Sequence, residues 1–265
     1  MPQVEIDNAT IHYQLMGAPS KPKVMLLAGL AGAGMTMWPQ VQYFAERYHV
    51  ILPDQRGTGQ SSRPADGHSI VQNARDMAAV LQHAGVWQAH IIGSSTGGAI
   101  AQIMALDHGD LVRSLTLTTS FARADAYMQR EFSVLRYFMQ HADASTIYAA
   151  FAMILFSPEY AAQNPDTLQT WIERAAQAPL EREATIQRID MIMEHDALAQ
   201  LGATRHPTCI IGGDNDVCTP LSLSKELASA IPGSELHIIK GGGHLIHSEQ
   251  DRLYFELVSA FIDAH

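Results

Sequence analysis

The stretch His90-Ile91-Ile92-Gly93-Ser94-Ser95-Thr96-Gly97-Gly98 decides the fold of this 265-residue chain. An apolar run leads into it, and Ser95 has a glycine two positions away on both sides. This is the layout of a nucleophile elbow, a tight turn between a buried strand and a helix that exposes its central side chain. Its neighbours must be small, because a Cβ at Gly93 or Gly97 would collide with the facing strand or helix. The elbow predicts that Ser95 is a nucleophile and that the backbone N–H of Thr96 stabilises an oxyanion.

On both sides of the elbow, short apolar runs alternate with segments of helical periodicity. The apolar runs are 23–28, 50–52, 88–93, 112–119, 208–212 and 235–239. The helical segments are 36–48, 69–84 with Ser69 as N-cap, 97–108, 221–230 and 248–263. Residues 4–17 alternate and turn at Asp7-Asn8, which predicts an antiparallel hairpin. Continuous apolar strands separated by amphipathic helices predict an α/β fold, with a mostly parallel sheet covered by helices on both faces.

One segment interrupts the alternation. From residue 121 to about 204 the pattern is wholly helical, with turn signals at Ser157-Pro158, Asn164-Pro165 and Ala178-Pro179. We expect a helical cap, 121–204, inserted within a single domain whose core comprises 1–120 and 205–265. Most of its methionine and aromatic side chains should pack on the sheet, and a minority should line an apolar pocket over Ser95. Five of its six arginines could bind a substrate carboxylate but are more often solvated; they are Arg130, Arg136, Arg174, Arg182 and Arg188.

A serine hydroxyl needs a base to remove its proton, and the base needs an acid that holds its tautomer. The run 235–239 ends in three glycines and His244, and none of the other twelve histidines combines a strand end with such an approach. The run 208–212 is followed by Asp214 and Asp216. We expect His244 to be the base and Asp216 the acid. Asp214 stays the alternative acid, although an Asp in a glycine-rich loop more often binds local backbone amides.

Two further loops follow strands at the same expected edge of the sheet. Gly29-Leu30-Ala31-Gly32-Ala33-Gly34 lacks the dinucleotide spacing, and no Gly-Lys-Ser/Thr follows it, so a phosphate loop is disfavoured. We expect the backbone N–H of Leu30 to be the second oxyanion donor. In the other loop, residues 54–61 (DQRGTGQS), Asp54 and Arg56 should brace the site through charge-assisted hydrogen bonds.

The bulk properties narrow the class of protein. A net charge of −10 argues against a nucleic-acid partner, and the sequence has no apolar run long enough to predict a membrane span. The two cysteines and the polar first residues predict a cytoplasmic protein without disulfides. The expected chemistry uses no cofactor and no metal; His244, His247, Asp214 and Asp216 are possible metal ligands, but they lack a metal-binding spacing. The expected partner is a small molecule, with a homodimer as an open alternative.

Together these segments resemble the α/β-hydrolase superfamily over nearly the whole chain. The motifs are DQRGTGQS at 54–61, GSSTGG at 93–98, GGDNDVCTP at 212–220 and GGGH at 241–244. The resemblance implies a triad of Ser95, Asp216 and His244, with Leu30 and Thr96 as oxyanion donors, and the acid stands four residues before a proline, as is frequent in the family.

Within the superfamily, the chain is most similar to the small 3-oxoadipate enol-lactonases and the aminoacrylate hydrolases. It departs from the usual pattern at Ala28-Gly29, where a His-Gly pair is common. The expected activity is hydrolysis of a small carboxylic ester or lactone through an acyl-enzyme. Amide or carbon–carbon bond hydrolysis, perhydrolysis, acyl transfer and a non-catalytic ligand-binding role remain alternatives.

Overall fold

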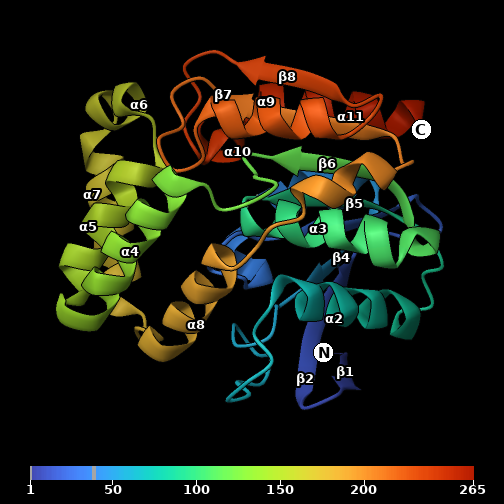
Figure 1. Ribbon diagram of the computed structural model, residues 1–265, viewed down its shortest axis with the longest axis horizontal. Helices are drawn as coiled ribbons and strands as arrows, with labels where there is room; N and C mark the ends of the chain where they lie inside the picture. The colour runs from blue at the N-terminus through green and yellow to red at the C-terminus, as the bar shows by residue number, and fades with distance from the viewer. Residues whose placement is uncertain (1, 38–39) are drawn as a thin grey trace.

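The computed structural model describes residues 2–37 and 40–265, which form an eight-stranded sheet with helices on both faces (Figure 1). The strands are β1 (Gln3–Ile6), β2 (Ala9–Met16), β3 (Lys23–Leu27), β4 (His49–Pro53), β5 (Ala89–Ser94), β6 (Val112–Thr118), β7 (Thr208–Gly213) and β8 (Glu235–Ile239). Their order is β1-β2-β4-β3-β5-β6-β7-β8. The pairs β1–β2 and β2–β4 are antiparallel, and all others are parallel. The predicted hairpin and the mostly parallel sheet are confirmed.

Two apolar layers enclose the sheet. Side chains along β3 alternate between them: Met25 and Leu27 face one layer, Val24 and Leu26 the other. The first layer contains α2 (Ile70–His83), α3 (Thr96–Asp107) and α9 (Leu221–Ala230). The second contains α1 (Gln40–Arg47), α10 (Ile246–Glu249) and α11 (Asp251–Ala264). Three short 3-10 helices are η1 (Gly34–Met37), η2 (Gly109–Leu111) and η3 (Leu198–Ala203). Burial of both faces explains why the central strands read as continuous apolar runs.

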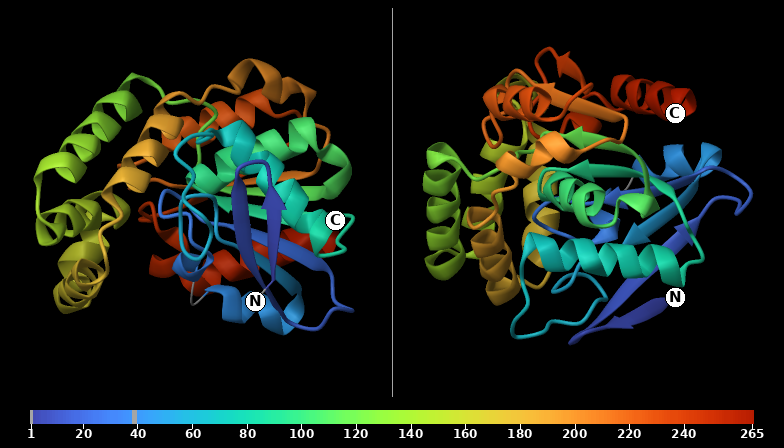
Figure 2. Two further views of the ribbon diagram at one scale, coloured as in Figure 1. Left: turned by 90° about the horizontal axis from the view of Figure 1, so that it is seen from below. Right: turned by 45° about the vertical axis from the view of Figure 1, so that its right-hand side comes forward.

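Between β6 and β7 the chain forms five consecutive helices, here called the helical segment. They are α4 (Ala126–His141), α5 (Ala144–Leu155), α6 (Pro158–Gln163), α7 (Pro165–Gln177) and α8 (Arg182–Met193). Proline is the first residue of α6 and α7, where its missing N–H costs nothing, so the turn signals at Ser157-Pro158 and Asn164-Pro165 are helix starts. Both views of Figure 2 show α4–α7 grouped together at one side of the molecule. The division into core and cap at residues 121 and 204 stays a prediction.

Two predicted helices differ from the structure. Of the predicted helix 36–48, residues 34–37 form η1, α1 begins at Gln40, and residues 38–39 lie outside the described ranges. The predicted helix 248–263 is interrupted at Gln250, whose φ of −136° and ψ of 51° are not helical. The carboxylate of Glu249, just before this break, accepts the backbone N–H groups of Ser157 (2.7 Å) and Gly243 (3.0 Å). These tertiary bonds hold α10 in an orientation that a continuous helix would not give.

Within the described ranges, no helix combines the length and the apolar character needed to cross a bilayer.

Candidate active site

The turn between β5 and α3 has the geometry of an elbow. Ser95 has φ of 54° and ψ of −120°, a conformation that side-chain-bearing residues rarely adopt. A Cβ at Gly93 would lie 2.3 Å from the carbonyl oxygen of Gly97, and one at Gly97 would lie 2.2 Å from that of Leu27. The predicted steric need for both glycines is confirmed. Ser95 makes no side-chain bond to cap α3, although it occupies the N-cap position.

Asp216 and His244 meet at the ends of β7 and β8. The imidazole Nδ1 lies 3.0 and 3.2 Å from the two carboxylate oxygens. Asp216 also accepts the backbone N–H groups of Cys218 and Thr219, each at 2.9 Å, and the Thr219 hydroxyl at 2.7 Å. Burial alone would lower the pKa of His244, but the adjacent Asp216 carboxylate holds it well above its usual range. Both side chains are buried, and the carboxylate fixes which imidazole nitrogen faces it.

The end of β6 connects Ser95 to His244. The N–H of Ser95 donates to the carbonyl of Thr118 (2.9 Å), and the hydroxyl of Thr119 donates to the carbonyl of His244 (3.1 Å). Thr119 itself has a positive φ of 44°, and its carbonyl oxygen lies 2.9 Å from the hydroxyl of Thr219, whose one hydrogen is shared between this carbonyl and the Asp216 carboxylate. These hydrogen bonds join the elbow to the acid loop (residues 214–220) and to the histidine loop (residues 240–244) at one edge of the sheet.

The alternative acid lies elsewhere. Asp214 is exposed, and its carboxylate accepts the backbone N–H of Gly241 at 2.6 Å, which is the local turn duty that the sequence suggested. Two glycines allow close approach here: a Cβ at Gly213, the last residue of β7, would lie 2.1 Å from the carbonyl oxygen of Gly242, and one at Gly243, in the histidine loop, would lie 2.3 Å from the nitrogen of Ser157. Asp214 is thus a structural contact between the acid and histidine loops.

Side chains from two other elements hold the loop after β3. Arg188, on α8, is 1% exposed and donates from Nε to the carbonyl of Leu30 (2.7 Å) and from Nη2 to that of Gly29 (3.3 Å) and to the side-chain oxygen of Gln55. Gln55 in turn donates to the carbonyl of Ala28 (2.8 Å). The N–H of Leu30 belongs to the same peptide as the Gly29 carbonyl, which faces Arg188. Because the carbonyl and N–H of a trans peptide point in opposite directions, the N–H of Leu30 points away from Arg188.

The same loop lies against the elbow. A Cβ at Gly29 would be 3.2 Å from the Cβ of Ser95 and 3.7 Å from its hydroxyl oxygen. A cavity of about 80 Å³ adjoins the loop and is lined by Leu30, Arg188 and the exposed pair Arg63–Glu181, among others. The apolar pocket expected over Ser95 stays a prediction.

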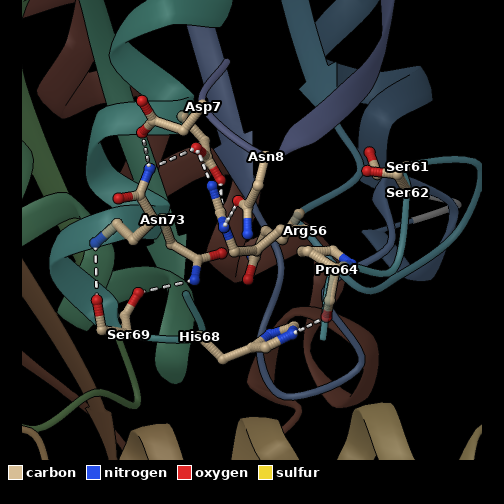
Figure 3. Close-up of polar contacts among 12 residues, drawn as sticks. Asp7, Asn8, Arg56, Ser61, Ser62, Pro64, His68, Ser69 and Asn73 are labelled. Carbon is tan, nitrogen blue, oxygen red and sulfur yellow. Dashed lines mark hydrogen bonds and ion pairs between the residues drawn. The ribbon is translucent and has the colours of Figure 1, made fainter. Parts of the chain in front are cut away.

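The DQRGTGQS loop is braced by buried charges. Asp54 accepts the N–H of Gly34 at 2.7 Å, and Arg56 forms two bonds with Asp76 of α2, at 2.6 and 2.8 Å. Figure 3 shows the guanidinium of Arg56 beside Asn8 of the N-terminal hairpin, whose side-chain oxygen it also reaches at 3.2 Å. Asp54 therefore binds the segment after β3, and Arg56 binds helix α2 and the turn of the N-terminal hairpin.

Sequence reasoning missed Glu131. It lies on α4, and both of its carboxylate oxygens are buried, with the weak donor of the Cys218 thiol as the hydrogen-bonding group beside them. Burial raises the pKa of Glu131 to about 7; nearby His244 lowers it, Asp216 raises it further, and the Cys218 thiol lowers it. The signal was present, because Glu131 falls within the apolar stripe of α4 formed by Met128, Phe132, Leu135 and Met139.

A parallel sheet of this order, with a strained serine elbow and an Asp–His pair at one edge, defines a hydrolase of the α/β class. The chain belongs to the alpha/beta hydrolase fold family, whose model matches residues 22–251. It is 32% identical over 264 residues to a protein of Azorhizobium caulinodans named "Putative carbamate hydrolase RutD", covering 98% of each chain.

Among solved structures, it is similar to the enol-lactonase from Burkholderia xenovorans LB400 (TM-score 0.87, 20% identity, 99% of this chain and 100% of that one). It is also similar to Est816, described as an N-acyl homoserine lactone degrading enzyme (TM-score 0.84, 26% identity, 98% of this chain and 100% of that one). The resemblance to the α/β hydrolases, with lactonase-like members, is confirmed.

Proposed function

We propose that the protein is a serine hydrolase that cleaves a small carboxylic ester or lactone through an acyl-enzyme on Ser95. The carrying observation is the strained, uncapped serine of the elbow, together with a histidine that Asp216 orients and that bonds to Thr119 just past the end of β6. The similarity to a lactone-degrading enzyme at 26% identity supports this substrate class.

In the proposed reaction, the hydroxyl of Ser95 attacks the substrate carbonyl while Nε2 of His244 takes its proton. The backbone N–H groups of Leu30 and Thr96 stabilise the negative oxygen of the tetrahedral intermediate. His244 then gives the proton to the leaving oxygen, and the ester C–O bond breaks. Water, deprotonated by His244, attacks the acyl-enzyme and releases the acid product with the serine regenerated. Asp216 stays ionised and stabilises the imidazolium that forms twice in the cycle.

The test is replacement of Ser95 by Ala, with Ser94→Ala as the matched control. With p-nitrophenyl butyrate as substrate, Ser95→Ala should lower kcat by about 10⁴-fold or more, whereas Ser94→Ala should retain most of the rate. A fluorophosphonate probe should form an adduct at Ser95 in the folded protein. A near wild-type rate in Ser95→Ala, or labelling elsewhere, would show that this serine is not the nucleophile.

The second candidate is the same chemistry on a carbamate or amide. It is favoured by the relative of A. caulinodans, which is 32% identical over 98% of both chains and whose name specifies a carbamate hydrolase. The two candidates differ in their products, because a carbamate releases ammonia or an amine. Measuring ammonia release from methyl carbamate beside acid release from methyl butyrate, in wild type and Ser95→Ala, separates them.

A further inference from the structure

Glu131 lies next to the Asp216–His244 pair without contributing a hydrogen bond to it. One turn earlier on α4, the hydroxyl of Tyr127 donates to the carbonyl of Val217 at 2.6 Å, which fixes this face of the helix against the acid loop. Glu131 is close enough to both His244 and Asp216 for each to shift its pKa.

The bonding capacity of the neighbouring groups is already used. Asp216 already accepts hydrogen bonds from Cys218, Thr219 and His244, so Glu131 is not needed to hold it in place. Burial raises the pKa of the Cys218 thiol to about 11, which leaves it a neutral and weak donor. Among the described residues, no arginine or lysine forms an ion pair with Glu131, so the positive charge that acts on the carboxyl is that of the His244 imidazole.

A buried carboxyl group without a strong partner is costly and calls for an explanation, such as a bound molecule that completes it. The bond from Tyr127 to Val217 holds this face of α4 against the acid loop, next to the Asp216–His244 pair. When ionised, the carboxylate of Glu131 only accepts hydrogen bonds, so it requires a donor on the bound molecule. Ammonium, amide and carbamate nitrogens meet this requirement, whereas ether and ester oxygens cannot donate at all.

We propose that Glu131 accepts a hydrogen bond from an N–H group of the substrate, so that the enzyme selects carbonyl compounds with a protonated or acylated nitrogen close to the scissile bond. This inference rests on the proposed function, because it places the substrate carbonyl at Ser95. Glu131 is then a specificity-determining residue that distinguishes N–H substrates from their N-methylated counterparts.

The experiment uses two matched pairs of methyl esters, followed by pH-stat titration. The neutral pair is the methyl esters of N-acetylglycine and N-acetylsarcosine; the second has an N-methyl group in place of the N–H. The cationic pair is the methyl esters of glycine and trimethylglycine; the second keeps the positive charge but has no N–H. For at least one pair, the wild-type ratio of kcat/KM should fall about tenfold or more in Glu131→Leu, since a hydrogen bond to a charged group is lost. The responsive pair identifies the nitrogen as acylated or cationic. The exposed Glu183, replaced by Leu, is the control and should leave both ratios unchanged.

A binding measurement separates this inference from the proposed function. In Ser95→Ala, an N–H ester should raise Tm more than its N-methylated partner, and adding Glu131→Leu should abolish the difference. If ester hydrolysis proves independent of Ser95, the proposed function fails and this Tm difference alone decides the role of Glu131. If both kcat/KM ratios stay the same in Glu131→Leu while hydrolysis depends on Ser95, only the assignment of Glu131 to a substrate N–H is overturned. Methyl glycolate and methyl methoxyacetate differ by one O–H. If the preference that depends on Glu131 is confined to this pair, the substrate donor is an O–H and the N–H assignment is overturned too.

Discussion

At the scale of single residues, the backbone of Ser95 stores strain that its position in the elbow requires. Its φ of 54° and ψ of −120° are accessible to glycine without a Cβ penalty. Ser95→Gly and Ser95→Ala both remove the hydroxyl, but only the glycine variant removes the Cβ. We therefore expect Ser95→Gly to be more stable than Ser95→Ala by about 1 kcal/mol, after the entropic cost of glycine. Urea denaturation of the two variants measures this, and equal stability would mean that the turn is relaxed.

The carboxyl of Glu131 should destabilise the fold in a pH-dependent way. Its pKa is raised from an ordinary value of 4.5 to about 7, so the folded state holds the proton more tightly than the unfolded state. Stability is therefore lost as pH rises from about 4.5 through about 7. Glu131→Gln should match wild type near pH 4 and exceed it by about 1 to 2 kcal/mol above pH 7, allowing for solvent screening. A difference that is constant with pH contradicts this.

At the scale of elements, α8 connects the helical segment to the loop after β3 through one buried cation. Burial lowers the pKa of Arg188 to about 10, and within the described ranges no carboxylate lies within ion-pair distance of it. Its partners are carbonyls and the Gln55 amide. The loop that Arg188 binds begins at Ala28-Gly29, where many similar hydrolases have His-Gly. This chain therefore lacks the imidazole that would otherwise brace the loop. In the proposed reaction, Arg188 is thus a positioning residue for the N–H of Leu30.

Replacing Arg188 by Met should lower kcat for ester hydrolysis by about 10- to 100-fold with little change in KM, because the loop N–H is no longer held. Arg182→Met is the matched control. Arg182 also lies on α8 and also binds backbone carbonyls, but those belong to Met139 and Ala142 of the helical segment. It should cost stability without this loss of kcat. Equal kcat losses in the two variants would assign Arg188 a merely structural role.

At the scale of the whole molecule, sequence reasoning succeeded where the cause is local. Gly93 and Gly97 predicted the elbow because each glycine excludes a nearby clash, and the apolar runs predicted the parallel sheet because both faces are buried. It failed where tertiary packing decides. Arg188 was one of five arginines on helical patterns, and only the fold shows which of them is buried. Glu131 was overlooked because the charged groups beside it, Asp216 and His244, come from loops about 85 to 113 positions later in the chain.

The buried pair of Arg56 and Asp76 should contribute to global stability in an asymmetric way. It joins the loop after β4 to α2, and the side chains of both residues are 0% exposed. Burial raises the pKa of Asp76, and Arg56 opposes that rise, so removing the arginine leaves a buried carboxyl without its cation. Arg56→Met should lower the free energy of unfolding by about 3 to 5 kcal/mol in urea denaturation, whereas Arg56→Met with Asp76→Leu should recover much of that loss.

The control is Arg63→Met. The ion pair of Arg63 with Glu181 is exposed (41% and 52%), so this variant should lose less than about 1 kcal/mol. If Arg56→Met and Arg63→Met have similar costs, burial does not set the strength of the pair. If the double variant is no more stable than Arg56→Met, the loss comes from packing around the guanidinium and not from an uncompensated charge.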